Sequence, residues 1–311
     1  MATTETRTHA PWRVFDVTVA AVERLSPSFR RFTLMGEDLE HYADLGPDAR
    51  VKVLLPLPES GYAHLPRTEP WFEAWRSLPE EQRNPMRTYT TRAVRRPGGP
   101  VPPRHGSGTE VVIDMVVHGD TGPATRWARR AEVGAPLALL GPDLRSEGPH
   151  GGVEFREPPA GVPLLLAGDE TAVPAITSIL ERLPQQATGA ALLEVPEDGD
   201  RWEVAAPPGV EVTWLARNGV PHGTHLVPAV ERAAARIRPP RRLTVELPEV
   251  DVDREILWEV AEAPPTCDVY AWLAGEAAVI RTLRRHLVGE LGIDRSCVSF
   301  MGYWRAGRAE G

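Results

Sequence analysis

Residues 162–183 read VPLLLAGDETAVPAITSILERL, and this stretch decides the fold of the second half of the chain. Its first six residues form a short apolar run, which predicts a buried strand over 162–167. A helix is expected over 173–183, because apolar residues recur there with helical spacing. A buried strand followed by an amphipathic helix is the repeating unit of a parallel sheet with helices on both faces.

The same alternation continues toward the C-terminus. Four further apolar segments predict strands, over 190–195, 210–216, 269–273 and 298–301. Two amphipathic segments predict helices, over 226–237 and 277–291. We therefore expect a C-terminal α/β domain with a parallel sheet over residues 151–311. We expect the boundary between this domain and the preceding one in the loop over 145–162, which is rich in glycine and proline.

The first half of the chain has a different pattern. Alternating and apolar runs predict about six strands, including those over 29–35, 86–94 and 110–118. Mostly antiparallel strands in this number close most readily into a barrel. Residues 1–150 are therefore expected to form an antiparallel β-barrel with one helix over 125–131.

Residues 56–86 do not fit the strand pattern of this half. Six prolines and a glycine punctuate the segment, which predicts a long surface excursion. A short helix is expected within it, over 71–78.

The composition is that of a soluble globular protein, with 42% hydrophobic and 25% charged residues. No apolar run reaches the roughly 20 residues of a membrane helix, and the polar N-terminus lacks the apolar core of a secretory signal. The net charge of −8 comes wholly from residues 151–311, which hold 24 acidic and 16 basic residues. That acidity argues against nucleic acid as a partner. We expect a cytoplasmic protein, and a monomer.

The chain has two cysteines, Cys267 and Cys297. An iron–sulfur cluster is excluded, because such clusters normally take four cysteine ligands. A disulfide stays open, but the lack of a secretory signal favours a reduced pair of buried thiols. The nine histidines show no metal-ligand spacing, so no dedicated metal site is expected.

The first chemical signal is the run Arg87-Thr88-Tyr89-Thr90 on an expected strand. Strand alternation puts Arg87 and Tyr89 on the same face. A guanidinium group suits a phosphate, and an aromatic ring suits the flat isoalloxazine of a flavin dinucleotide. An ordinary surface strand with exposed charges is the alternative.

The second signal is the loop over 119–125, GDTGPAT, which leaves the strand ending at His118 and enters a helix. Glycine permits close approach of the backbone, and Pro123 suits the first helical turn. Free N–H groups at a helix start attract a pyrophosphate, to which Thr125 adds a hydroxyl. An ordinary strand–turn–helix connection is the alternative. His118 is a candidate flavin contact, although single histidines are more often structural.

Together with Trp127, GDETAVPAI over 168–176, WLAGE over 272–276 and YWRAG over 303–307, these motifs resemble the siderophore-interacting protein family. That family is a branch of the ferredoxin–NADP reductase superfamily, and the resemblance covers nearly the whole chain. Members are FAD-containing reductases that use NADPH or NADH to reduce ferric siderophores, and some draw on ferredoxin instead.

The resemblance implies a set of FAD-binding residues. Arg87 would bind an FAD phosphate, Tyr89 would stack on the flavin and Thr90 would contact its ring. The full set is Arg87, Thr88, Tyr89, Thr90, His118, Gly122, Pro123, Ala124 and Thr125, of which Gly122, Ala124 and Thr125 would hold the pyrophosphate.

On the nicotinamide side, no GxGxxG follows any strand, so the standard dinucleotide fingerprint is absent. Instead, the turn Asp169-Glu170-Thr171 follows the expected strand over 162–167, and Gly275-Glu276 makes a second such turn. In the superfamily that the chain resembles, the first turn borders the nicotinamide. A simple helix cap is the alternative for Asp169.

Four further residues are candidates. Arg217 follows the strand over 210–216, where a ribose 2′-phosphate would lie, and an arginine there would favour NADPH. An exposed loop arginine is the alternative. Tyr303 and Trp304 are expected to cover the flavin face that nicotinamide reaches, unless they are packing residues. Arg305 is a candidate contact for an anionic siderophore.

The expected function is therefore an NAD(P)H-dependent flavoprotein reductase that passes electrons to a ferric siderophore and releases Fe(II). Flavin suits this step because it accepts a hydride and can release electrons singly. No protein ligand to the iron is expected. The alternatives are a general flavin-dependent reductase with another acceptor, and a non-catalytic siderophore-binding protein.

Overall fold

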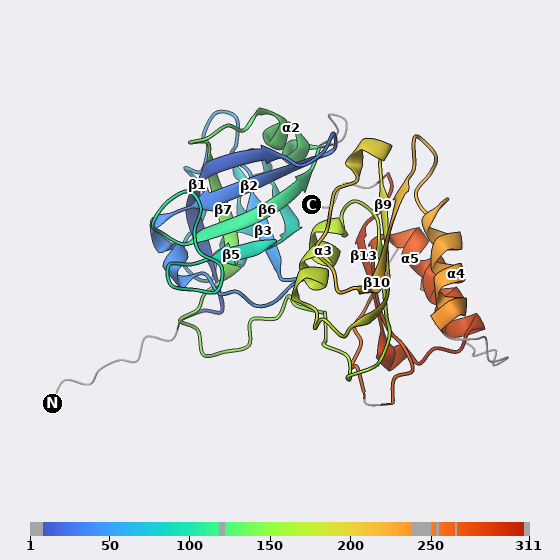
Figure 1. Cartoon of the computed structure of the whole chain (residues 1–311). Helices are drawn as coiled ribbons and strands as arrows, with labels where there is room; N and C mark the ends of the chain where they lie inside the picture. Colours follow the sequence, from blue (N-terminus) through green and yellow to red (C-terminus); the bar gives the residue numbers. More distant parts are fainter. Residues whose placement is uncertain (1–8, 118–121, 238–249, 253–254, 265, 308–311) are drawn as a thin grey trace. The chain divides into compact units, whose positions relative to one another are not determined.

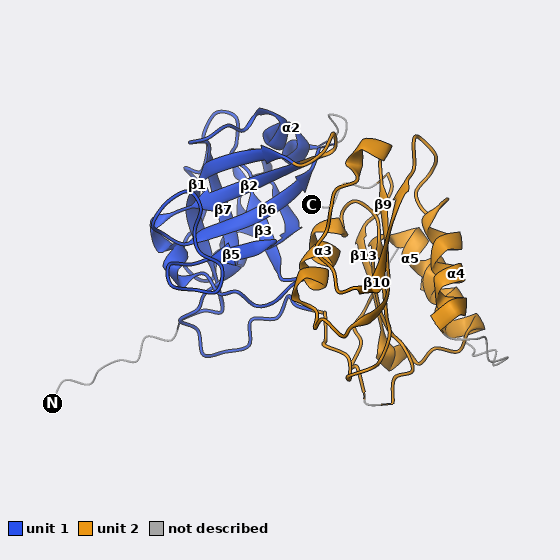
Figure 2. Ribbon diagram, viewed as in Figure 1, with its two compact units in different colours: residues 1–24, 30–153, 311 blue, residues 25–29, 154–310 orange. Residues whose placement is uncertain are grey.

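The chain forms two compact units, shown in Figures 1 and 2. The computed structural model describes residues 9–117, 122–237, 250–252, 255–264 and 266–307. The first unit comprises residues 1–24 and 30–153, and the second comprises 25–29 and 154–310. Each unit has its own apolar core.

The first unit is a curled antiparallel sheet of seven strands in the order β4-β3-β7-β1-β2-β6-β5. The strands are β1 (Trp12–Arg24), β2 (Phe29–Met35), β3 (Arg50–Leu54), β4 (Met86–Thr90), β5 (Ala93–Arg95), β6 (Glu110–Val116) and β7 (Pro136–Pro142). The two edge strands, β4 and β5, are consecutive in the chain, with only Thr91 and Arg92 between them. The N–H of Arg92 donates to Val112 O of β6 at 2.8 Å and extends the pairing of β5 with β6. The sheet curls into a half-barrel, which confirms the expected antiparallel β fold of the first unit.

The barrel core is built from the inward side chains of its strands. Phe15, Phe32, Val51 and Leu139 are fully buried in one apolar cluster. Helix α2 (Pro123–Arg130) packs its small buried residues, among them Ala128, against the same cluster. This packing fixes the start of α2 relative to the strand that precedes it.

The excursion over 56–86 contains the expected short helix, α1 (Trp71–Ser77), followed by a 3₁₀ turn, Glu80–Gln82. Trp75 of α1 is buried against Val14, Leu54 and Leu140. Its indole Nε1 donates to Asn84 O at 3.1 Å. The excursion is therefore held to the barrel by an apolar cluster of its own.

The second unit is a six-stranded sheet in the order β10-β9-β8-β12-β13-β11. The strands are β8 (Leu164–Gly168), β9 (Thr188–Val195), β10 (Gly209–Ala216), β11 (Trp258–Glu259), β12 (Tyr270–Glu276) and β13 (Val298–Trp304). The expected parallel sheet is confirmed, and the two-residue strand β11 adds an antiparallel edge. The chain runs outward from β8 to β10 on one side and from β12 to β13 on the other. The order therefore reverses between β8 and β12, which is where open α/β sheets bind their ligands.

In the described part of this unit, helix α3 (Val173–Arg182) covers one face of the sheet, and α4 (Leu226–Ile237) and α5 (Ala277–Arg284) cover the other (Figure 1). Helix α5 continues as a π-helical turn, Arg285–Glu290. Val230 of α4 and Ile280 of α5 are fully buried in the cluster that contains Leu165 of β8. Within the described residues, no helix is long and apolar enough to cross a membrane.

The two cysteines are joined in a disulfide, Cys267–Cys297, so the expectation of a reduced pair is wrong. Cys267 lies just before β12, and Cys297 lies just before β13. These strands are parallel neighbours, so their first residues meet at the same edge of the sheet and bring the two Cα atoms to 5.8 Å. The disulfide thus lies at the amino edge of the sheet, opposite the edge where β12 and β13 end.

Candidate functional site

Strand β4 carries the first group of candidate residues, and two of them are accessible. Arg87 is half-buried, and its Nη1 donates to the neighbouring carbonyl of Met86 at 2.8 Å. Thr88 is exposed, and its hydroxyl accepts a 2.6 Å hydrogen bond from Lys52 Nζ. Arg87 of β4, and Lys52 of β3 paired with Thr88, therefore present cationic groups that suit anionic ligands, but on opposite faces of the sheet.

The other two candidates on β4 lie on opposite faces of the strand, and both are at least half-buried. Tyr89 is half-buried and packs against the barrel core. Burial raises the pKa of its hydroxyl, and the charge of Arg87 offsets this only in part. Thr90 is buried, with 5% of its surface exposed. Stacking of Tyr89 on a flavin, and the contact of Thr90 with its ring, stay predictions.

The start of α2 carries the second group. Gly122 precedes the helix and, having no side chain, cannot itself cap the first turn. Pro123 occupies the first helical position, Ala124 is buried and Thr125 is half-buried. A Cβ added at Gly122 would meet no described atom within 4 Å. The N–H groups in the first turn of a helix suit a phosphate. His118 lies outside the described residues.

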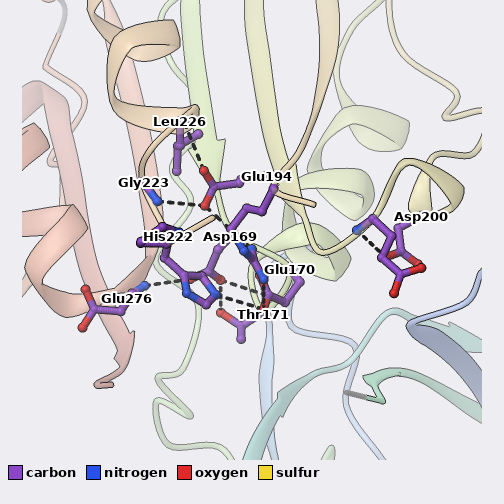
Figure 3. Close-up of polar contacts among 12 residues, drawn as sticks. Asp169, Glu170, Thr171, Glu194, Asp200, His222, Gly223, Leu226 and Glu276 are labelled. Atoms are coloured by element: carbon purple, nitrogen blue, oxygen red, sulfur yellow. Dashed lines mark hydrogen bonds and ion pairs between the residues drawn. The ribbon is translucent and has the colours of Figure 1, made fainter. Parts of the chain in front are cut away.

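In the second unit, Asp169 joins the ends of β8, β12 and β13 through its hydrogen bonds, and Figure 3 shows it beside Glu276 of β12. Asp169 is 2% exposed. Its Oδ1 accepts hydrogen bonds from Thr171 N at 2.9 Å and Thr171 Oγ1 at 2.5 Å. Its Oδ2 accepts from Glu276 N and from Trp304 Nε1, both at 2.8 Å. The residue that caps α3 is Ala172, so the helix-cap alternative for Asp169 does not hold.

Gly275 makes this close approach possible. Its φ of +152° is one that residues with a side chain rarely adopt. A Cβ at this position would lie 2.6 Å from Asp169 Oδ2. The glycine in the second predicted turn is therefore required by the carboxylate in the first.

Two adjoining carboxyl groups at this edge have opposite pKa shifts. Burial, and then the charge of Glu170, raise the pKa of Asp169 to about 6. Burial alone would also raise the pKa of Glu170, but hydrogen bonds from His222 and Arg217 outweigh it and lower the pKa to about 2. Glu170 is therefore the charged partner, and Asp169 is the one that can hold a proton near neutral pH.

Arg217 lies at the end of β10, as predicted, but it is 8% exposed, so the exposed-arginine alternative is wrong. Its Nη1 and Nη2 donate to the two carboxylate oxygens of Glu170 at 2.5 and 2.8 Å. His222 Nε2 lies 3.1 Å from Glu170 Oε1, and this contact raises the pKa of the imidazole although burial would lower it. Figure 3 shows His222 beside the two acidic residues. The guanidinium thus already has an anionic partner.

Two residues of this network were missed by the sequence reasoning. Glu194 of β9 is fully buried, and its carboxylate accepts from Gly223 N at 2.9 Å and Leu226 N at 3.1 Å, at the start of α4. His222 lies in the turn between β10 and α4. Their position in the sequence could have indicated both residues, because each lies at or beyond the carboxyl end of an expected parallel strand.

Asp169, Glu170 and His222 also approach closely enough to be considered as metal ligands, with one ligand atom of each within 4.8 Å of the others. Both oxygens of Glu170 are bonded to Arg217, and both oxygens of Asp169 accept N–H or O–H groups. A cation here would have to compete with a guanidinium. The three residues therefore fit a hydrogen-bonded network better than a metal centre.

Glu276 caps α5. Its Oε2 accepts from Ala278 N at 2.8 Å and Val279 N at 3.0 Å. Because this carboxylate occupies the first turn of the helix, the start of α5 is not open to a phosphate group.

The aromatic pair at the end of β13 has two different environments. Tyr303 stacks on Trp258, with ring centroids 5.8 Å apart, which favours the packing alternative for this residue. The ring of Trp304 lies edge-on to His222, with centroids 4.8 Å apart. Arg305 is half-buried, and its Nη2 donates to Glu255 O at 3.3 Å. Its role toward a siderophore stays a prediction.

An open pocket of about 740 Å³ lies beside this network, at the carboxyl ends of β9 and β10. It is lined by Pro196, Glu197, Asp198, Gly199, Arg217, Asn218, Gly219, Val220 and His222. The edge of a doubly wound sheet is where nucleotides bind. The predicted residues Asp169, Glu170, Thr171, Arg217, Gly275, Glu276 and Trp304 thus gather at one edge of the second unit, whereas those on β4 and α2 belong to the first.

Comparison with known proteins gives matches along both units. Residues 18–146 match the family model described as the siderophore-interacting FAD-binding domain, and residues 163–307 match that of the siderophore-interacting protein. Ferric vibriobactin reductase ViuB of Vibrio cholerae is 31% identical over 286 residues, with 92% of this chain and 87% of the relative covered.

Two further relatives span both units. The NADPH-dependent ferric-chelate reductase of Escherichia coli is 28% identical over 297 residues, with 94% of each chain covered. The crystal structure of the siderophore-interacting protein SipS from Aeromonas hydrophila superposes with a TM-score of 0.66 at 30% identity, and covers 96% of this chain and 94% of its own.

Proposed function

The chain belongs to the siderophore-interacting protein family, and from this premise we propose that it is an NAD(P)H-dependent flavoprotein that reduces ferric siderophores. The observation that carries the proposal is the order of two sites along one chain. An FAD-binding barrel with a helix that starts behind Gly122 and Pro123 precedes a doubly wound sheet with an open pocket at its carboxyl edge. A hydride donor and a flavin are the ligands that such a pair of units serves.

The residues of the first unit fit FAD. Arg87 would hold a phosphate, and the exposed hydroxyl of Thr88 lies on the opposite face of β4. The N–H groups of the first turn of α2, behind Gly122 and Pro123, would hold the pyrophosphate. Half-buried Tyr89 would limit water at the ring. Bound FAD supplies the ability to accept a hydride as two electrons and release the electrons singly.

The residues of the second unit would bind and orient the nicotinamide dinucleotide. The pocket beyond β9 and β10 would take its adenosine part. The turn at Asp169, fixed by four hydrogen bonds, would border the nicotinamide. Because Asp169 has a pKa of about 6, it can hold or give up a proton beside the bound ligand near neutral pH.

The overall reaction balances without a protein redox group. One NAD(P)H supplies two electrons, two Fe(III) become two Fe(II), and one proton is released. Siderophore oxygen donors hold Fe(III) much more tightly than Fe(II), so reduction frees the metal. The iron is substrate, and we propose no protein ligand to it. Ferredoxin as another donor, a monomeric state and a cytoplasmic location remain predictions.

Reduction assays with several acceptors separate this proposal from its alternatives. Holoprotein, NADH or NADPH, and a ferric catecholate or ferric hydroxamate siderophore are mixed without oxygen, and Fe(II) is trapped with ferrozine. The proposal predicts faster turnover with a ferric siderophore than with free FMN or a quinone. The reverse order would assign a general flavin reductase. A protein that binds the chelate but takes up no FAD would be a carrier.

A further inference from the structure

The pocket beyond β9 and β10 contains two cationic side chains among its described lining residues, Arg217 and His222, and both are bonded to one carboxylate. Arg217 places both of its terminal nitrogens on Glu170, and His222 lies 3.1 Å from the same group. Arg217 Nη1 also lies 3.7 Å from a second buried carboxylate, that of Glu194. The positive charge that faces the pocket is therefore already neutralised from within the protein.

A ribose 2′-phosphate would have to take Arg217 away from Glu170. Glu170 is 2% exposed, so losing its partner would leave a buried charge without compensation. The unphosphorylated ribose of NADH can bind while the Glu170–Arg217 ion pair stays intact, because a neutral hydroxyl group neither needs nor displaces a guanidinium group. The Glu170–Arg217 ion pair therefore disfavours the binding of NADPH.

The opposite side of the pocket is acidic. Glu197 and Asp198 follow β9 directly, and both line the cavity. Asp198 has 64% of its side chain exposed, pairs with Arg201 and accepts a 2.8 Å hydrogen bond from Asn218 Nδ2. In doubly wound sheets, an acidic residue after the second strand accepts hydrogen bonds from the ribose 2′-hydroxyl of NAD. A 2′-phosphate dianion has no proton to donate to this carboxylate.

We propose that this pocket selects NADH over NADPH, with Asp198 as the acceptor for the ribose hydroxyl and Glu170 as the group that withholds Arg217 from a 2′-phosphate. The inference rests on the proposed function, of which it specifies the donor. It reverses the expectation that an arginine at the end of β10 favours NADPH. The residue is where the sequence predicts it, but its partner changes its role.

The test uses two ligands that differ only in the 2′-phosphate, ADP-ribose and ADP-ribose 2′-phosphate. Neither can be reduced, so calorimetric binding to the holoprotein measures the pocket independently of turnover. The dissociation constant of ADP-ribose is expected to be about tenfold lower, or lower still, than that of its 2′-phosphate. One unfavourable charge contact changes an affinity by about this factor.

Two variants address the two halves of the proposal. Glu170→Gln removes the charge that neutralises Arg217, and Asp198→Asn removes the exposed acid. Each is expected to shift the affinity ratio toward the 2′-phosphate by about tenfold. Glu211→Gln is the matched control, because Glu211 is an exposed acidic residue of β10 that does not line the pocket and is paired with Arg236. Asp198→Asn keeps the test valid if Glu170→Gln does not fold.

Equal or tighter binding of ADP-ribose 2′-phosphate by the wild type would overturn the inference about the donor. The proposed function would still stand if NADPH then reduced the flavin of the same protein. An unchanged ratio in both variants would also overturn it. If neither ligand binds and neither dinucleotide reduces the flavin, the proposed function fails and the inference fails with it.

Discussion

The indole Nε1 of Trp304 donates a 2.8 Å hydrogen bond to Asp169 Oδ2, and so joins the end of β13 to the turn after β8. Asp169 is buried, and a carboxylate acceptor makes this bond stronger than one between neutral groups. The position of Trp304 therefore depends on the charge state of Asp169, whose pKa is raised to about 6.

This relationship predicts a pH-dependent indole signal. In protein labelled with ¹⁵N-tryptophan, the Nε1–H resonance of Trp304 should move with a midpoint near pH 6, because protonation of Asp169 weakens its acceptor. The resonance is assigned by its loss in Trp304→Phe. Asp169→Asn should remove the titration. A Trp304 signal that titrates equally in wild type and Asp169→Asn would show that another group controls it.

Glu170 predicts a pH dependence of stability. Its pKa is lowered from 4.5 to about 2, so the unfolded chain takes up the proton before the folded one does. The Glu170–Arg217 pair therefore stabilises the fold above pH 4.5, and this contribution, up to about 3 kcal/mol, is lost as the pH falls toward 2.

Urea unfolding of the wild type and of Glu170→Gln, at several pH values between 6 and 3, measures that contribution. The difference between the two free energies of unfolding should shrink as the pH falls. Glu211→Gln serves as the exposed control and should show no such trend. A difference independent of pH would mean that Glu170 is not charged in the fold.

Gly275→Ala should destabilise the second unit. The new Cβ would lie 2.6 Å from Asp169 Oδ2 at a φ of +152°, so backbone and carboxylate would both have to shift. A loss of about 1–3 kcal/mol is expected, together with a displaced Trp304 resonance. Gly148→Ala is the matched control, because its Cβ would meet only Ser146 Oγ at 3.7 Å. Wild-type stability in Gly275→Ala would show that the turn tolerates a side chain.

Arg87→Ala should weaken FAD binding without unfolding the barrel. A charge-assisted hydrogen bond to a phosphate contributes about 1.5–3 kcal/mol, so the dissociation constant for FAD should rise about 10- to 100-fold. Fluorescence titration of the apoprotein with FAD measures it. Arg76→Ala, an exposed arginine on α1, is the control of equal charge. Full FAD affinity in Arg87→Ala would remove that residue from the site.

The disulfide should stabilise the second unit without affecting the nucleotide pocket. Replacing both cysteines by alanine should lower the free energy of unfolding by about 2–4 kcal/mol, since the cross-link closes a loop of 30 residues. ADP-ribose affinity should stay unchanged, because the disulfide and the pocket lie at opposite edges of the sheet. A large loss of affinity in the double variant would show that the two edges are coupled.

The sequence predicted most of the architecture because the two units have different hydrophobic periods. The run over 164–167 and its counterparts are apolar on both faces, which only a covered parallel sheet requires. The alternation over 29–35 indicates a half-buried strand instead. The two-residue strand β11 was too short to give a pattern.

The chemistry of the second site was less predictable, because it depends on partners distant in sequence. Glu170 and Arg217 are 47 positions apart, and they meet only because β10 lies two strands from β8. The disulfide depends in the same way on β12 and β13 being neighbours. Local motifs found the turns at Asp169 and Gly275, but they carried no information about which charges would be paired.

In the proposed function, electrons pass from a nicotinamide through a flavin to a ferric siderophore. The decisive measurement is the visible spectrum of the purified protein without oxygen, recorded before and after NADH and then after a ferric catecholate siderophore. We expect a flavin spectrum that bleaches with NADH and returns when the chelate is added. A colourless protein that takes up no added FAD, or a bleached flavin that the chelate does not reoxidise, would contradict the proposed function.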